Sequence, residues 1–133
     1  EKRVHCHMQR MGGINGVVLA KDESHIISVG QEKKINFWGL DAPDAAHTQF
    51  LDGNDPDGDE GRVIAISGDG KLIATGGSAG VLRLFSYESA ALLSEAAGHS
   101  AAITSVAFSP DGKQIISVGE DGSIFFWMVF AQP

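Results

Sequence analysis

Three regularly placed aromatic residues constrain the fold of this chain more than any other feature of its sequence. Trp38, Phe85 and Trp127 lie 47 and 42 residues apart. Each of them follows a glycine by eight residues and a hydroxyl residue by ten. Those partners are Gly30, Gly77 and Gly119, and Ser28, Thr75 and Ser117. Such self-similarity with a period in the forties indicates tandem copies of one structural unit.

The last copy indicates what the unit is. Its apolar and aromatic residues fall in three short runs with the composition of β-strands, Ile103–Phe108, Ile115–Val118 and Ile124–Trp127. The segments Pro110-Asp111-Gly112 and Glu120-Asp121-Gly122 separate these runs. Because proline presets φ and glycine accepts a positive φ, both segments predict tight turns. We therefore expect an all-β chain of about eleven or twelve short strands, with no helix longer than one turn.

The same stretch carries a characteristic set of polar and aromatic residues. Gly98-His99 precedes the first run, Ser117 lies in the second, Asp121 lies in the following turn and Trp127 ends the third. In this combination the stretch resembles a WD repeat, the unit of WD-repeat β-propellers. The resemblance implies a buried tetrad in which Trp127 bonds to Ser117, Ser117 to His99, and His99 to Asp121. The chain departs from the family at Met128, where the family usually has aspartate.

The resemblance implies a fold of three WD-repeat blades, each a four-stranded antiparallel sheet. We expect the repeats to span about residues 9–51, 52–95 and 96–133, with residues 1–8 as the outer strand of a preceding blade. Closed propellers have roughly four to eight blades, so three blades form part of a β-propeller and not a closed ring. The remaining blades, from the same or a longer chain, are therefore expected partners, and self-assembly is the alternative.

The first two repeats keep only partial tetrads. These are Ser28 and Trp38 in the first repeat, and Thr75 and Phe85 in the second. In the first repeat, Arg10 and Glu32 align with the usual histidine and aspartate. In the second repeat Asp57 aligns with the histidine and Ala79 with the aspartate. Since Ala79 has no polar side chain, we expect the second repeat to hold by packing alone.

Composition and charge exclude several classes of protein. The chain has a formal net charge of −7 and a pI of about 5.0, which argues against a general nucleic-acid or anionic-membrane surface. No apolar run approaches the roughly 20 residues that span a bilayer. Cys6 is the only cysteine, so an internal disulfide framework is excluded and a reducing compartment is favoured. We expect an intracellular, cytoplasmic protein.

Three motifs could suggest chemistry, and each has a plainer explanation. On a strand, the two histidines of His5-Cys6-His7 point to the face opposite the cysteine, which disfavours a metal site. Asp52–Gly61 is acidic like a calcium loop, but with Asp52 as position one the fifth position is Pro56, so we expect a solvated acidic loop. Thr75–Gly80 lacks the Lys-Ser/Thr of a phosphate loop. We expect no catalytic residue, no cofactor and no bound metal.

A propeller of this kind predicts a non-catalytic scaffold for protein–protein interaction. The candidate interaction residues lie in loops before the first strands and between the second and third strands of the repeats. They are Arg10, Gln31, Lys33, Lys34, Asp57, Asp59, Ser78, Ser100 and Glu120.

Several segments bring the chain closer to one subgroup of the family. They are Lys34–Trp38, Ala74–Gly77, Ser86-Tyr87, Gly98–Ser100, Ile103-Thr104 and Val118–Gly122. With them the chain resembles the last repeats of cilia- and flagella-associated WD-repeat proteins, which are components of axonemal doublet microtubules. The resemblance implies tubulin or other axonemal proteins as partners and a place in the cilium or flagellum. The alternative is an adaptor or substrate-receptor propeller in a ubiquitin-ligase or signalling complex.

Overall fold

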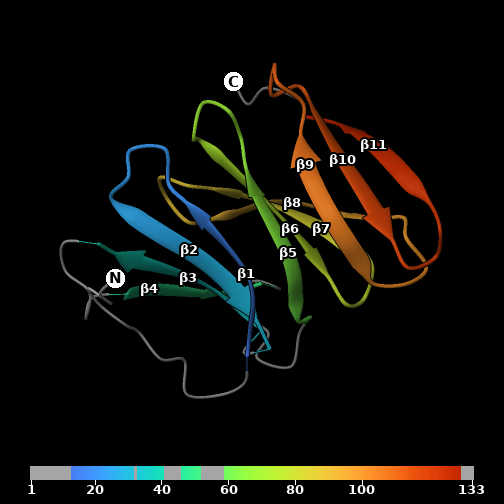
Figure 1. The fold of residues 1–133 in the computed structure, drawn as a ribbon, viewed down its shortest axis with the longest axis horizontal. Coiled ribbons are helices and arrows are strands. Elements are labelled where there is room, and N and C mark those ends of the chain that lie inside the picture. Colours follow the sequence, from blue (N-terminus) through green and yellow to red (C-terminus); the bar gives the residue numbers. More distant parts are fainter. Residues whose placement is uncertain (1–12, 32, 41–45, 52–58, 130–133) are drawn as a thin grey trace, which may run out of the picture.

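A computed structural model describes residues 13–31, 33–40, 46–51 and 59–129. Within these ranges the chain consists of eleven β-strands joined by turns, and it contains no helix there. The strands form three antiparallel sheets that lie side by side (Figure 1). The predicted all-β fold is therefore confirmed.

Each sheet is built from strands that follow one another in the sequence. The first sheet contains β1 (Ile14–Leu19), β2 (His25–Gly30), β3 (Lys34–Gly39) and β4 (Ala46–Phe50). The middle sheet contains β5 (Gly61–Ile66), β6 (Leu72–Gly77), β7 (Val81–Ser86) and β8 (Leu92–Ala97). The third sheet contains β9 (Ile103–Phe108), β10 (Gln114–Gly119) and β11 (Ile124–Met128). Gly70 and Gly112 have φ values of 77° and 73° in the tight turns, which glycine adopts without steric cost.

The third sheet differs from the other two in its number of strands. It has three strands within the described residues, in the order β11-β10-β9. β11 pairs with β10 along one edge, and its other edge has no partner strand in the described part of the chain. An open edge of this kind carries unpaired N–H and C=O groups and can accept another strand.

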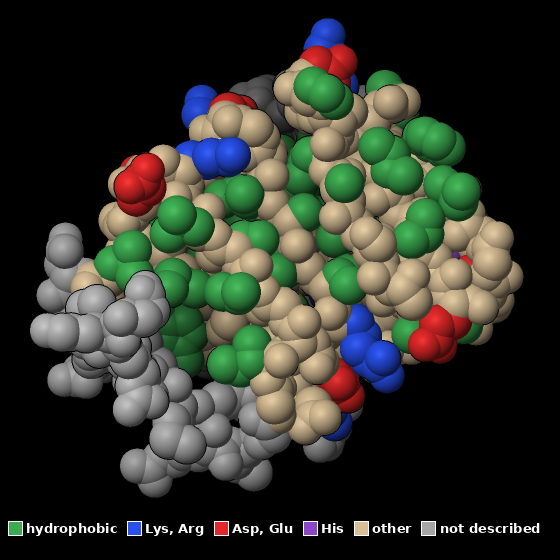
Figure 2. Space-filling model, viewed as in Figure 1, with side chains coloured by type: hydrophobic (Ala, Val, Ile, Leu, Met, Phe, Trp, Pro, Cys, Tyr) green, Lys and Arg blue, Asp and Glu red, His purple; other side chains and the backbone are tan. Residues whose placement is uncertain are grey.

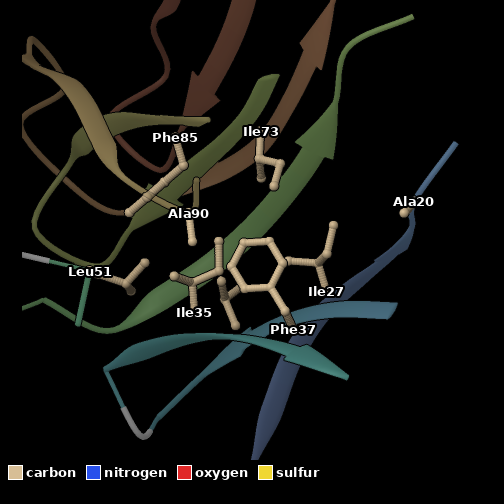
Figure 3. Close-up of a cluster of buried hydrophobic side chains, with 9 residues drawn as sticks. Ala20, Ile27, Ile35, Phe37, Leu51, Ile73, Phe85 and Ala90 are labelled. Carbon is tan, nitrogen blue, oxygen red and sulfur yellow. The ribbon is translucent and has the colours of Figure 1, made fainter. Parts of the chain in front are cut away.

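The first and middle sheets bury an apolar cluster between them (Figure 3). Ile27, Ile35 and Phe37 of the first sheet pack with Ile73 and Phe85 of the middle sheet. All five side chains are buried. Since burying one large apolar side chain contributes about 1.5–3 kcal/mol, this cluster supplies much of the free energy that holds the two sheets together.

The middle and third sheets meet in the same way. Ala74 and Leu82 of the middle sheet pack with Ile103, Val106 and Ile115 of the third. Side chains alternate between the two faces of a strand, so the middle sheet uses both of its faces. It is the one sheet of the described structure that is covered on both sides.

The third sheet exposes a face that the other two sheets bury. Ile124 holds in β11 the place of Ile35 in β3 and Leu82 in β7, three residues before the repeated aromatic residue. Ile35 and Leu82 are 0 % and 5 % exposed, whereas Ile124 is 61 % exposed. Phe126 and Met128 share its face and are 68 % and 57 % exposed. We call these three residues the open face of the third sheet, and Figure 2 shows hydrophobic side chains over this region at the upper right.

The first sheet is open on the opposite kind of face. Val17 pairs with Ser28 on β2 as Val106 pairs with Ser117 on β10. Val106 is 9 % exposed against the middle sheet, but Val17 is 60 % exposed. At each internal interface, the face that carries Ile35 or Leu82 in one sheet packs against the opposite face of the next sheet. One face of each of these two kinds is therefore open, at Ile124 and at Val17.

Equivalent substitutions on the closed and open faces should have different effects on stability. Leu82→Ala removes a buried side chain and should lower the free energy of unfolding by about 2–5 kcal/mol. Ile124→Ala removes an exposed side chain at the matching position and should change it by less than about 0.5 kcal/mol. Urea denaturation followed by circular dichroism at a fixed low protein concentration measures both. Equal losses would show that the face of β11 is covered in the isolated chain.

Candidate functional site

The candidate loops gather at one end of the three sheets. β2, β6 and β10 all finish at this end with a glycine, at Gly30, Gly77 and Gly119, and we call it the glycine end. A Cβ atom on Gly119 would lie 2.7 Å from His99 Nδ1, and one on Gly77 would collide with the Asp59 carboxylate. The repeated glycine is needed because the segment before each first strand folds over it.

In the third sheet, a hydrogen-bonded chain runs from β11 to the loop before β9. Trp127 Nε1 donates to Ser117 Oγ at 2.8 Å, and Ser117 Oγ lies 2.8 Å from His99 Nε2. Ser117 and His99 are both buried. The Ser117 hydroxyl can accept a hydrogen bond from the Trp127 indole and donate one to the His99 imidazole, so Trp127 Nε1 and His99 Nε2 both have a partner.

A serine that the sequence argument missed continues this chain. Ser123 Oγ lies 2.9 Å from His99 Nδ1 and donates to Asp121 Oδ1 at 2.7 Å. The direct distance from His99 Nδ1 to Asp121 Oδ1 is longer, at 3.3 Å. The available signal was the position of Ser123, two residues after an aspartate in a tight turn, where a hydroxyl reaches the carboxylate.

Asp121 joins two loops of the glycine end. Hydrogen bonds from the Ser123 hydroxyl and from the backbone N–H groups of Ser100 and Ser123 hold the pKa of Asp121 well below its usual range. The Phe125 ring packs against this network: its centroid lies 4.5 Å from that of the tilted His99 ring and 5.2 Å from that of Trp127, with which it stacks. The charged carboxylate and the packed rings together fix the loops before β9 and before β11.

In the middle sheet, a buried ion pair replaces the histidine network. Asp59 accepts hydrogen bonds from Arg83 Nη1 at 2.9 Å, from Ser78 Oγ at 2.7 Å and from the Ala79 N–H at 3.0 Å. The side chains of Asp59 and Arg83 are only 3 % and 5 % exposed. Arg83 Nε also donates to Glu95 Oε2 on β8 at 2.8 Å.

The balance of burial and hydrogen bonding decides the charge of Asp59. Burial acts to raise the pKa of this carboxyl, but hydrogen bonds from Arg83, Ser78 and Ala79, with the charge of Arg83, outweigh burial and leave the pKa below its usual value. The pair is therefore ionised on both sides. A buried charge is tolerable only with such partners.

These contacts correct two expectations about the middle repeat. It does not hold by packing alone, because Asp59 and Arg83 form a buried ion pair. Asp59 is also not a free loop residue that could contact a partner or belong to a solvated acidic loop. The signal for Arg83 was a single charge in the apolar run Val81–Phe85, since a charge inside a buried strand requires a partner.

The first sheet keeps a shorter version of the network. Trp38 Nε1 donates to Ser28 Oγ at 3.0 Å. Asn36 is buried at the place that Arg83 and Phe125 hold in the other sheets, two residues before the repeated aromatic residue. One position of the repeat thus holds an amide, a guanidinium group and an aromatic ring. Arg10 and Glu32, which align with His99 and Asp121, lie outside the described residues.

The other candidate interaction residues differ in exposure. Gln31, Ser100 and Glu120 are exposed, Lys33, Lys34 and Ser78 are half-buried, and Asp57 lies outside the described residues. Gln31 Oε1 accepts a hydrogen bond from the Gly13 N–H at 2.9 Å. Ser78 is held by Asp59, and the Ser100 N–H donates to Asp121 Oδ2 at 2.8 Å. The surface offered at this end is therefore a set of polar side chains on fixed loops.

Neither metal ligands nor membrane spans are found in the described part of the chain. No group of three or more His, Cys, Asp or Glu side chains there could hold a metal ion. His5-Cys6-His7 and most of the acidic segment 52–61 lie outside the described residues. Among residues 13–31, 33–40, 46–51 and 59–129, no helix has the length and hydrophobicity to cross a bilayer.

Removal of Ser117 should disrupt the network of the third sheet. Ser117→Ala leaves the Trp127 N–H and His99 Nε2 without their shared partner, which should lower the free energy of unfolding by about 1–3 kcal/mol for each unsatisfied group. Ser105→Ala, an exposed serine of β9 in the same sheet, is the matched control and should change little. Equal effects in urea denaturation would show that Ser117 contributes only packing.

The ion pair of the middle sheet gives a second prediction. Asp59→Ala leaves Arg83 buried with Glu95 as a half-exposed partner and should cost about 3 kcal/mol, whereas Glu95→Ala should cost less than about 1 kcal/mol. The double variant Asp59→Ala/Arg83→Met should recover stability, because it also removes the buried guanidinium charge that Asp59 balanced. Thermal denaturation of the four proteins measures the difference. A double variant less stable than Asp59→Ala would contradict the account.

Comparison with known proteins finds similar sequences. A family model for the WD domain, G-beta repeat, matches residues 91–128. The chain is 35 % identical over 111 residues to cilia- and flagella-associated protein 52 of Chlamydomonas reinhardtii. This match covers 84 % of this chain and 17 % of that protein. The Bos taurus protein of the same name is 30 % identical over 106 residues, covering 80 % and 16 %. The chain thus spans about a sixth of the length of these relatives.

A solved structure shows the same fold. The crystal structure of RRP9 WD40 repeats matches with a TM-score of 0.84 at 24 % sequence identity, over 92 % of this chain and 37 % of that chain. The three stacked sheets correspond to consecutive blades of such a propeller, although the described residues do not close a ring. Residues 91–128 are therefore a WD repeat, and the three sheets have the fold of WD-repeat propeller blades.

Proposed function

We propose that the chain is a non-catalytic scaffold for protein–protein interaction, and that it contributes three consecutive blades to a larger WD-repeat propeller in a ciliary or axonemal assembly. The observation that carries this proposal is the pair of open faces. Val17 and Ile124 are exposed at places where the internal interfaces bury their counterparts, Val106 and Leu82. Further blades that cover both faces would complete the stacking that the middle sheet already shows.

The polar groups at the glycine end support a scaffold and not a catalyst. The His99–Ser123–Asp121 network and the Asp59–Arg83 pair use their polar atoms to fix loops. Exposed side chains such as those of Gln31 and Glu120 are then presented on a rigid backbone, which favours specific recognition because little loop ordering remains to oppose binding.

The ciliary part of the proposal rests on the relatives. Two of them carry cilia- and flagella-associated names, and the chain matches the Chlamydomonas protein over 84 % of its own length. These names support the proposal of an axonemal location in the cilium or flagellum, with axonemal proteins, tubulin among them, as proposed partners. The alternative, an adaptor of a ubiquitin-ligase or signalling complex, is the opposing outcome of the test.

Co-sedimentation with purified, demembranated axonemes tests this proposal. The tagged chain should pellet with axonemes in a saturable manner. The double variant Gln31→Ala/Glu120→Ala should pellet less while keeping the β-sheet spectrum of the unchanged chain. A chain that stays in the supernatant at every axoneme concentration, and that retains ubiquitin-ligase subunits when used as bait in cell extract, would overturn the ciliary assignment.

A further inference from the structure

A pocket lies at the end of the sheets opposite the glycine end, where the first and middle sheets meet. It has a volume of about 350 Å³. The turn between β1 and β2 and the turn between β7 and β8 form its sides. The residues that matter here are Asp22, Ser24, His25, Phe37, Tyr87 and Glu88. None of them belongs to the loops that sequence reasoning selected, and the blade networks do not use them.

Aromatic rings form the apolar part of the pocket. Phe37, which is buried, lines the pocket, and the centroid of Tyr87 lies 6.1 Å from that of Phe37. His25 meets Tyr87 edge to face with a centroid distance of 6.2 Å. Faces of aromatic rings carry negative electrostatic potential and attract cations within about 6 Å.

Asp22 supplies a fixed negative charge beside these rings. Hydrogen bonds from the Ser24 hydroxyl and the Ser24 N–H, at 2.7 Å and 3.0 Å to Oδ1, lower its pKa. The second carboxylate oxygen, Oδ2, has one contact within the described residues, with the Tyr87 hydroxyl at 3.5 Å, which is too long for a strong hydrogen bond. Oδ2 can therefore accept a further donor.

The turn that holds Asp22 differs from its two counterparts. The matching turns of the other sheets read Ser67-Gly68-Asp69-Gly70-Lys71 and Ser109-Pro110-Asp111-Gly112-Lys113, whereas the first reads Ala20-Lys21-Asp22-Glu23-Ser24. The lysine that follows the other two aspartates is thus replaced by Ser24. Glu23 has a φ of 61°, a left-handed conformation that the other turns give to glycine. Strained backbone of this kind concentrates at functional sites.

We propose that this pocket binds a lysine or arginine side chain of a partner protein. Asp22 and Glu88 would pair with the cationic head, and the Tyr87 and Phe37 rings would contact it and its alkyl stem. Among the residues that the structure describes, no lysine or arginine lines the pocket. The inference rests on the proposed scaffold function in one respect, that the cationic side chain belongs to a partner protein. It does not depend on the ciliary location.

The single tyrosine of the sequence makes the pocket directly observable. In the chain labelled with 3-fluorotyrosine, the one ¹⁹F resonance reports on Tyr87. Nα-acetyl-lysine methylamide and Nα-acetyl-arginine methylamide, whose side chains stay charged, should shift this resonance in a saturable manner. Nα-acetyl-norleucine methylamide, whose side chain has no charge, should not shift it. Because no ciliary partner is present, a negative result would leave the proposed function intact.

Charge-removing variants complete the test. Asp22→Asn should weaken binding of the lysine derivative by roughly threefold to tenfold, and Glu88→Gln should weaken it less, since Glu88 is exposed. Asp111→Asn, the same change in the matching turn of the third sheet, should leave binding unchanged. Binding by the norleucine derivative as strong as by lysine, or equal affinities in Asp22→Asn and Asp111→Asn, would overturn the proposal. So would the absence of any shift.

Discussion

The burial of one sheet face against the next is the interaction on which this structure depends. A four-stranded sheet has two faces, and here both faces of every sheet carry apolar side chains. Hydrogen bonds join the strands within each sheet but do not cover its faces. The middle sheet is covered twice and supplies residues to both clusters, so it is the element that joins the other two.

The polar networks depend on this stacking and differ from sheet to sheet. The backbone path at the glycine end is repeated, with a glycine beneath the chain that enters each first strand. The side chains at one place in this path are nevertheless Asn36, Arg83 and Phe125. Each requires a different partner, and the partner determines which neighbouring loop is fixed. The repeat therefore conserves geometry while allowing the chemistry of each blade to change, which is how one fold can carry different surfaces.

Features that recur at a fixed spacing could be predicted from the sequence. The period and the three sheets follow from spacing, whereas the set of residues around His99 and Trp127 follows from the resemblance to a WD repeat. The Asp59–Arg83 pair could not be found in this way, because counting along the repeat selects Asp57 and because spacing does not show which of several acidic residues turns inward. Ser123 was missed for a similar reason, since its role appears only when two loops are seen together.

The pocket at the opposite end was beyond spacing arguments altogether. It forms where Asp22 and Tyr87, which are 65 positions apart, come within hydrogen-bond reach across two sheets. Its distinctive feature is a departure from the repeat, at Ala20 and Ser24, and not an instance of it. In a repeat protein such departures are informative, because the unchanged copies in the same chain show what the ordinary turn requires.

Hydrogen exchange read by mass spectrometry tests most directly the claim that stacking between sheets controls stability. Backbone amides of β6 and β7, in the sheet covered on both sides, should exchange far more slowly than those of β11, which has an open face and an open edge. Protection of β11 should rise when further propeller blades or a second copy cover it. Equal protection of β7 and β11 in the dilute isolated chain would contradict the account.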